Sequence, residues 1–177
     1  MSEIAYLQPT CIWQKFDEIC SIPRPSKHEE KIAHYLIEFA EKRNLTYKQD
    51  AAGNVIIEKN ATPGHEQCET VALQAHMDMV PQKRNDSNHN FLTDPIEPYI
   101  DGNFVRANGT TLGSDNGMGM AMILAILDSQ EIEHGPLQAV FTVDEETGLT
   151  GAFALKDNFL TGKTLINLDS EDDKEII

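Results

Sequence analysis

The apolar run at residues 71–75 ends at a histidine, and an aspartate follows two positions later. An apolar run of this length is typical of a buried strand. Side chains two positions apart on an extended chain point to the same side. His76 and Asp78 are therefore expected together at one end of the predicted strand, where an imidazole beside a carboxylate indicates a possible metal site.

Acidic residues follow two further predicted strands in the same way. The strand predicted at 137–143 runs into the sequence DEETG at 144–148, and the strand predicted at 164–168 runs into DSED at 169–172. Asp115 lies in a turn, GSDNG, before an apolar helix, whose positive dipole end favours an ionised carboxylate. Each motif alone is also typical of a solvated acidic turn, but their joint occurrence indicates a site.

Clustered carboxylates raise one another's pKa, and a divalent cation removes that cost. One imidazole with several carboxylate oxygens suits zinc, with cobalt or manganese as alternatives. Glu145 and Glu146 are adjacent after a strand and point in different directions, so one can bind an ion while the other acts as a general base. Asp115 is central enough to contact two ions.

The elements that position these residues alternate along the chain. Strands predicted at 71–75, 137–143 and 164–168 are separated by helices predicted at 120–127 and 151–157. This order predicts an α/β fold with a mostly parallel central sheet. In such sheets ligands bind beyond the carboxyl ends of the strands, which is where the acids stand.

The first part of the sequence predicts packing elements. A first helix is predicted with Thr10 as its N-terminal cap. A second predicted helix opens with the capping-box pattern SKHE at 26–29 and runs to about residue 44. Short strands are predicted at 47–49 and 55–57. The polar segment 82–98 is predicted to be a long surface excursion, and a hairpin follows it around 99–106.

Composition narrows the class of protein. The 177 residues suffice for one domain. With 29 acidic against 14 basic residues, the net charge is −15, which argues against binding to nucleic acid or an anionic membrane. The three cysteines form no C-x-x-C pair, the start resembles no signal peptide, and no apolar run approaches a membrane span. We expect a soluble cytoplasmic protein.

Five stretches carry a family resemblance: IPRPS at 22–26, HMDMVPQK at 76–83, GTTLGSDNG at 109–117, DEETG at 144–148 and NLDSED at 167–172. The sequence resembles the M20 family of zinc metallopeptidases, and most closely its aminoacyl-histidine dipeptidase branch. The resemblance covers essentially the whole chain. It implies a three-layer α/β/α zinc-peptidase catalytic domain.

The resemblance also implies a ligand set for two Zn²⁺ ions, for which Co²⁺ or Mn²⁺ are possible substitutes. Asp115 would bridge the two ions. His76 and Asp169 would complete the protein ligands of the first ion, and Glu146 would serve the second.

Further roles follow from the same resemblance. Glu145 would be the general base that takes a proton from the attacking water and later protonates the leaving amine, and Asp78 would orient His76. The implied reaction is hydrolysis of dipeptides, including Xaa-His dipeptides, with broad specificity. Intact members are expected to form homodimers through a lid domain.

Members of the family are usually more than twice as long as this chain. We therefore expect residues 1–177 to be the N-terminal portion of the catalytic domain, incomplete at its C-terminus and without the lid and dimerisation domain. The second ion would lack a histidine ligand, and the chain would be weakly active or inactive. Alternatives are another M20 amidohydrolase, such as a tripeptidase or N-acyl amino acid deacylase, or a non-catalytic acidic metal-binding fragment.

Overall fold

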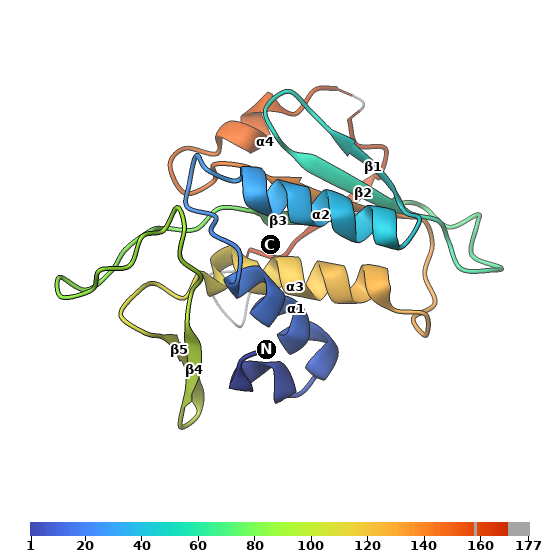
Figure 1. Ribbon diagram of the computed structural model, residues 1–177. Helices are drawn as coiled ribbons and strands as arrows, with labels where there is room; N and C mark the ends of the chain where they lie inside the picture. Colours follow the sequence, from blue (N-terminus) through green and yellow to red (C-terminus); the bar gives the residue numbers. More distant parts are fainter. Residues whose placement is uncertain (158, 170–177) are drawn as a thin grey trace.

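The computed structural model describes residues 1–157 and 159–169. The predicted α/β alternation is confirmed, and the strands and helices follow one another along the chain as Figure 1 shows. The elements are η1 Glu3–Tyr6, α1 Thr10–Cys20, α2 Glu30–Lys42, β1 Thr46–Gln49, β2 Val55–Lys59, β3 Val71–His76, β4 Pro98–Asp101, β5 Phe104–Ala107, α3 Ser114–Asp128, β6 Leu137–Thr142, α4 Thr150–Ala154 and β7 Thr164–Asn167.

Within the described residues the central sheet has the strand order β1-β2-β6-β3-β7. β3 lies between β6 and β7 and is parallel to both, whereas β2 is antiparallel to its neighbours β1 and β6. Only β2 therefore opposes the common direction, and the prediction of a mostly parallel sheet is confirmed. β3 and β6 end level with each other, because His76 lies opposite Thr142.

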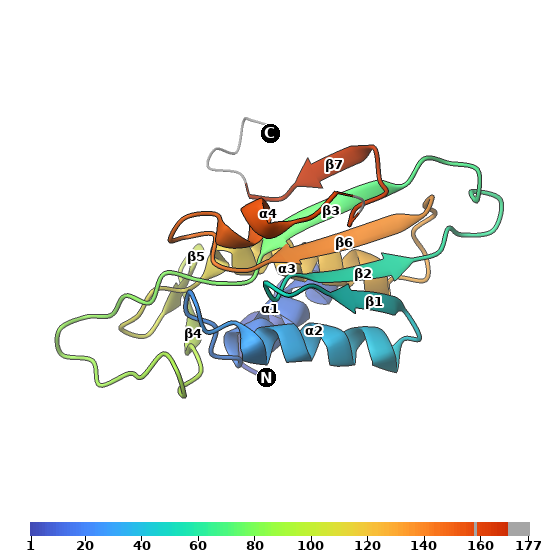
Figure 2. The same cartoon turned by 90° about the horizontal axis from the view of Figure 1, so that it is seen from above.

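The two faces of the sheet are covered unequally. In Figure 1, helices α1 and α3 lie below the sheet and α2 lies in front of it, and the apolar side chains of the three helices form the main core with alternate strand residues such as Leu73 and Phe141. On the opposite face, Ile56, Ala72 and Val140 form a smaller cluster that Phe159 and Leu160 cover. The short helix α4 lies over this second face (Figure 2). Strands β3 and β6 are thus buried between two layers.

The predicted capping box at 26–29 is wrong. Helix α2 begins at Glu30, and no side chain caps its first turn. Ser26 instead donates its hydroxyl to Asp78 at 2.8 Å, and Glu29 accepts the backbone N–H groups of Lys27 at 2.8 Å and Asp144 at 3.0 Å. A hydrogen bond to an ionised carboxylate is stronger than one between neutral groups, so Ser26 binds Asp78 and not the first turn of α2. Both residues therefore connect α2 to the segments that follow β3 and β6.

Other element bounds differ by a few residues. α3 begins at Ser114 rather than near residue 120, and its first turn is irregular because Asp115 and Asn116 have non-helical backbone angles. α1 begins at Thr10 with Pro9 before it as cap residue, so Thr10 is inside the helix. α4 ends at Ala154, three residues earlier than predicted. The hairpin β4-β5 is confirmed.

The segment between β3 and β4 contains neither a helix nor a strand and extends away from the sheet (Figure 1). Within the described residues no helix combines the length and the apolar character that crossing a bilayer requires. The acids predicted to continue to residue 172 lie, from residue 170 on, outside the described residues.

Candidate functional site

The predicted site residues meet at the carboxyl edge of the sheet. His76 ends β3, Glu145 and Glu146 follow β6, and Asp169 follows β7. Because these strands are parallel and adjacent, their carboxyl ends share one edge. The first turn of α3 approaches the same edge and brings in Asp115. The structure thus brings together all six residues that the sequence singled out: His76, Asp78, Asp115, Glu145, Glu146 and Asp169.

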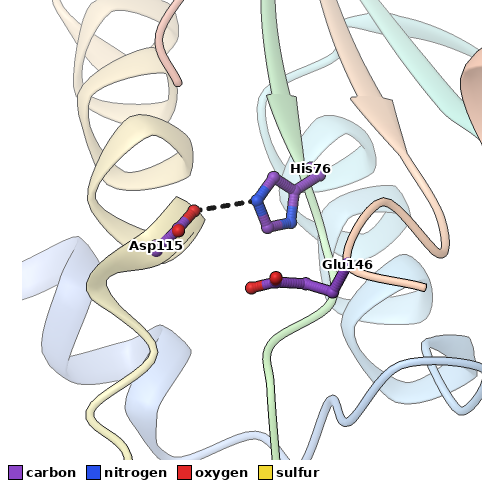
Figure 3. A group of neighbouring side chains, drawn as sticks. All are labelled: His76, Asp115 and Glu146. Carbon is purple, nitrogen blue, oxygen red and sulfur yellow. Dashed lines mark hydrogen bonds and ion pairs between the residues drawn. The ribbon is translucent and has the colours of Figure 1, made fainter. Parts of the chain in front are cut away.

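The imidazole of His76 is the centre of this arrangement and is fully buried. Its Nε2 atom lies 2.9 Å from Oδ1 of Asp115, 3.7 Å from Oδ2 of Asp169 and 3.9 Å from Oε2 of Glu145. Figure 3 shows Nε2 directed at Asp115, with the carboxylate of Glu146 entering the same space from the segment after β6. One ring nitrogen is therefore surrounded by carboxylate oxygens.

The donor atoms fit a divalent cation. His76, Asp115 and Glu146 offer ligand atoms that all lie within 4.8 Å of one another, and so do His76, Glu145 and Asp169. One imidazole nitrogen and several carboxylate oxygens form a set that suits zinc, cobalt or manganese, whereas soft metals prefer thiolates. The two groups share His76, and its Nε2 binds only one ion at a time, so they are two alternative ligand sets around the same imidazole.

The charges in the site also favour binding of a cation. Burial raises the pKa of Glu145, and the charges of Asp169 and Asp78 raise it further. Burial and the charge of Asp115 likewise raise the pKa of Glu146. The pKa of Asp169 is raised by burial and by Asp115, although the amide of Asn116 and His76 lower it. The carboxylates thus resist being ionised together, and a dication would offset that repulsion.

Asp78 fixes the orientation of His76. Its Oδ1 atom lies 3.2 Å from Nδ1 of His76, on the side of the ring opposite Asp115. Burial alone would raise the pKa of Asp78, but hydrogen bonds from His76, the backbone of Glu145 and Ser26 lower it to about 2. With Nδ1–H engaged by an ionised carboxylate, Nε2 is the atom left to face the acidic cluster.

Burial would lower the pKa of His76. The hydrogen bond and charge of Asp78, together with the charge of Asp169, raise it to about 9 instead. The imidazole is therefore more basic than a free one, and it has to lose its proton before it can bind a metal ion.

Asp78 also holds the segment that carries the two glutamates. Its Oδ1 accepts the backbone N–H of Glu145 at 3.0 Å, and its Oδ2 accepts the backbone N–H of Glu146 at 3.2 Å. The sequence predicts only the contact with His76. One carboxylate thus sets the relative positions of the end of β3 and the segment after β6.

Asp144 organises the same segment from the other side. Its backbone φ is +50°, and its two carboxylate oxygens accept the hydroxyls of Thr147 and Thr150, both at 2.6 Å. Its N–H donates to the buried Glu29 at 3.0 Å. The turn that presents Glu145 and Glu146 is therefore closed on itself and connected to the start of α2.

The sequence alone assigns no role to two further polar residues at the site. Arg24 is only 2% exposed and donates to backbone carbonyls on both sides of the site. Burial lowers its pKa to about 10. Asn116 donates from Nδ2 to the carbonyl of Leu168 at 3.1 Å and so joins α3 to the end of β7. The only sequence signal was that Arg24 and Asn116 lie in stretches already noted for their family resemblance.

A cavity of about 680 Å³ opens over the acidic cluster. The carboxylates of its wall are those of Asp115, Glu145, Glu146 and Asp169. Ser114, Asn116 and Gly119 also line it, together with three apolar side chains. These apolar side chains are Met118, Met122 and Leu168. The volume lies within the range of small-molecule sites, so a ligand of a few residues can enter beside the carboxylates.

One family model and several known proteins match this chain. The family model described as Peptidase family M20/M25/M40 matches residues 72–171, the part of the chain that contains the acidic cluster. The cytosol non-specific dipeptidase of Escherichia coli (strain K12) is 51% identical over 176 residues, covering 99% of this chain and 36% of that protein.

Solved structures of peptidases also match this chain. The crystal structure of aminoacylhistidine dipeptidase from Vibrio alginolyticus matches with a TM-score of 0.95 and 55% identity, covering 97% of this chain and 35% of that one. A tripeptidase from Staphylococcus aureus matches with a TM-score of 0.77 and 26% identity, covering 92% of this chain and 43% of that one. The chain therefore spans about a third of the length of the Escherichia coli and Vibrio alginolyticus dipeptidases that it matches.

Proposed function

The chain belongs to Peptidase family M20/M25/M40, and from that premise we propose that its acidic site serves the metal-dependent hydrolysis of dipeptides, including Xaa-His dipeptides. The observation that carries the proposal is the meeting of one imidazole and four carboxylates at the carboxyl edge of the sheet. The 51% identity to a dipeptidase and the structural match to an aminoacylhistidine dipeptidase support the substrate class. The first of these names also supports a cytosolic location.

We assign some of the site residues as metal ligands and the others as the general base and its supporting residue. Asp115 would bridge two Zn²⁺ ions, His76 and Asp169 would complete the first ion's protein ligands, and Glu146 would serve the second. The distances from Nε2 of His76 to Asp115 and Asp169, 2.9 and 3.7 Å, support the first set. Bound divalent ions would polarise the scissile carbonyl and make water easier to deprotonate.

Glu145 is the residue we assign as general base. It accepts one proton from the attacking water and returns it to the amine nitrogen as the peptide bond breaks, so it ends unchanged. Its pKa is raised by burial and by Asp169, which brings it nearer to the value that suits proton transfer near neutral pH. Asp78 would hold the imidazole and, through the backbone of Glu145, the base itself.

The ligand sets are unequal. Asp115, His76 and Asp169 give the first ion three protein ligands, whereas Asp115 and Glu146 give the second ion two. We infer that the 177-residue chain binds the first ion more tightly than the second and that its dipeptidase activity is low or absent. A homodimer formed through a lid domain remains a prediction from the family resemblance.

Calorimetric titration of the purified chain with Zn²⁺ tests the proposal. We expect one tight and one weaker site, and Glu145→Gln should keep both while losing any hydrolysis of Xaa-His dipeptides measured over long incubation. Glu133→Gln is a matched control, because the Glu133 side chain is 81% exposed and lies outside the site. Two equally tight sites, or measurable turnover of the wild-type chain that Glu145→Gln leaves unaltered, would contradict the assignment.

A second candidate is a tripeptidase activity, because the match to a tripeptidase structure has a TM-score of 0.77. The open cavity over the carboxylates does not itself limit the ligand to two residues. A panel of Xaa-His dipeptides, tripeptides and N-acyl amino acids would separate the two peptidase activities and also test a deacylase.

A further inference from the structure

The guanidinium of Arg24 connects two segments that carry site residues. Its Nη1 atom donates to the carbonyl oxygens of Met77 at 2.9 Å and Asp78 at 2.8 Å, directly after β3. Its Nη2 atom donates to the carbonyl oxygen of Gly113, directly before α3. One segment presents His76 and the other presents Asp115, so a single side chain bridges their backbones.

The space around the guanidinium is kept free by glycines. A Cβ atom at Gly113, whose φ is +69°, would lie 2.7 Å from Nη2 of Arg24, and a Cβ atom at Gly117 would lie 2.6 Å from it. Both separations are too short for real atoms. The two glycines bracket Asp115 in the sequence, so the turn that presents this carboxylate closely surrounds the arginine.

The acceptors of Arg24 are backbone carbonyls, not carboxylates. Among the described residues, no carboxylate oxygen hydrogen-bonds to its guanidinium. Its charge nevertheless interacts with Asp78, Asp115 and Glu146. A buried cation so close to a cation-binding site would by charge alone weaken metal binding. Any benefit of Arg24 to the site must therefore come from the geometry that it imposes.

We propose that Arg24 is a positioning residue of the metal site, which fixes the spacing between His76 and Asp115 by joining the backbone after β3 to the backbone before α3. The inference rests on the proposed function, because the spacing matters only if the two side chains share an ion. It extends that function by assigning a role to the arginine of the IPRPS stretch.

The test uses Co²⁺ alone as probe, followed by calorimetry and by the visible absorption of the bound ion, which reports its coordination. Arg24→Met removes both donors and charge, whereas Arg24→Lys keeps the charge with a different donor geometry. Gly117→Ala keeps the arginine but displaces its guanidinium. The matched control is Arg43→Met. Arg43 binds Asp128 through two hydrogen bonds of 2.6 and 2.9 Å, at the opposite end of α3 from Asp115.

We expect Arg24→Met to lower the Co²⁺ affinity by about 10- to 100-fold, the range found when residues that orient metal ligands are changed, and to alter the absorption spectrum. Arg24→Lys and Gly117→Ala should show smaller losses with altered spectra. Arg43→Met should keep the wild-type affinity and spectrum even where it lowers the unfolding midpoint. If Arg24→Met does not fold, the same measurements on Arg24→Lys and Gly117→Ala decide the outcome.

The outcomes separate this inference from the proposed function. Failure of the wild-type chain to bind Co²⁺ or Zn²⁺ would overturn the proposed function and, with it, the role of Arg24. Wild-type binding together with unchanged or increased affinity in the folded Arg24 variants would overturn the positioning role alone. An equal loss of affinity in Arg43→Met would also overturn it, because the effect would then follow general stability.

Discussion

Replacing Asp78 by Asn is the sharpest test of how the site is held together. The carboxylate is fully buried, and its two oxygens accept from His76, Ser26 and the backbone of Glu145 and Glu146. An amide keeps the shape but turns one acceptor oxygen into an NH₂ donor. Glu145 donates to Oδ1 and Glu146 to Oδ2, so one backbone N–H loses its acceptor whichever way the amide turns.

The cost can be worked out in two ways. A hydrogen bond to a charged group contributes roughly 1.5–3 kcal/mol. The pKa of Asp78 falls from 3.8 to about 2 on folding, and a difference of about 2 pKa units corresponds to roughly 2.5 kcal/mol. We therefore expect Asp78→Asn to lower the free energy of unfolding of the metal-free chain by about 2 kcal/mol.

Metal binding gives a second measurement on the same variant. Loss of the carboxylate frees His76 to rotate and to change tautomer, which typically lowers metal affinity by about 10- to 100-fold. Urea unfolding in the presence of a chelator and calorimetric Zn²⁺ titration would measure the two effects. Ser26→Ala is the control, because it removes one donor to Asp78 and leaves the carboxylate in place. An Asp78→Asn variant with wild-type Zn²⁺ affinity would refute the orienting role.

Two further predictions concern stability away from the ligands. Asp128 has a pKa lowered chiefly by its hydrogen bonds to Arg43, so its contribution is present above the ordinary carboxyl pKa and is lost as the pH falls through the lowered value. The unfolding free energies of the wild type and Asp128→Asn should therefore converge in acid, which urea titrations at several pH values would reveal. Gly151→Ala should destabilise the chain by about 1–3 kcal/mol, because a Cβ there would lie 2.4 Å from the carbonyl oxygen of Val143 and 2.5 Å from Oδ1 of Asn54. An unchanged urea midpoint would contradict this second prediction.

The sequence predicted the part of the fold that local patterns determine. The strands that became β3, β6 and β7 were apolar runs with clear ends, and their alternation with helices indicated a mostly parallel sheet. Because parallel strands share a carboxyl edge, the acids that follow them were expected to meet, and the structure does bring them together. The sheet order, with β3 between β6 and β7, depends on pairings between distant segments and had no local signal.

The differences between sequence and structure have two physical causes: polar partners that are distant in the sequence, and a local effect of glycine. Ser26 was predicted to cap a helix because its neighbours fit a capping box, but its hydroxyl donates to Asp78, 52 residues further along the chain. The start of α3 was missed because the glycines around Asp115 are poor helix formers. The sequence does not reveal the contacts of Arg24, because a buried arginine among backbone carbonyls cannot be recognised without the carbonyls. For Ser26 and Arg24, a polar partner far away in the sequence decided the outcome.

These distant partners suggest how the site withstands its own charge. Three buried polar side chains each join two of the four segments that carry site residues: Arg24 joins the end of β3 to the start of α3, Asp78 joins the end of β3 to the segment after β6, and Asn116 joins α3 to the end of β7. Carboxylates that repel one another would otherwise move apart when no cation is bound. Every one of the four segments has at least one such connection, so the repulsion between the carboxylates cannot easily move their backbones apart. The ligand atoms therefore stay near the separations that an ion requires.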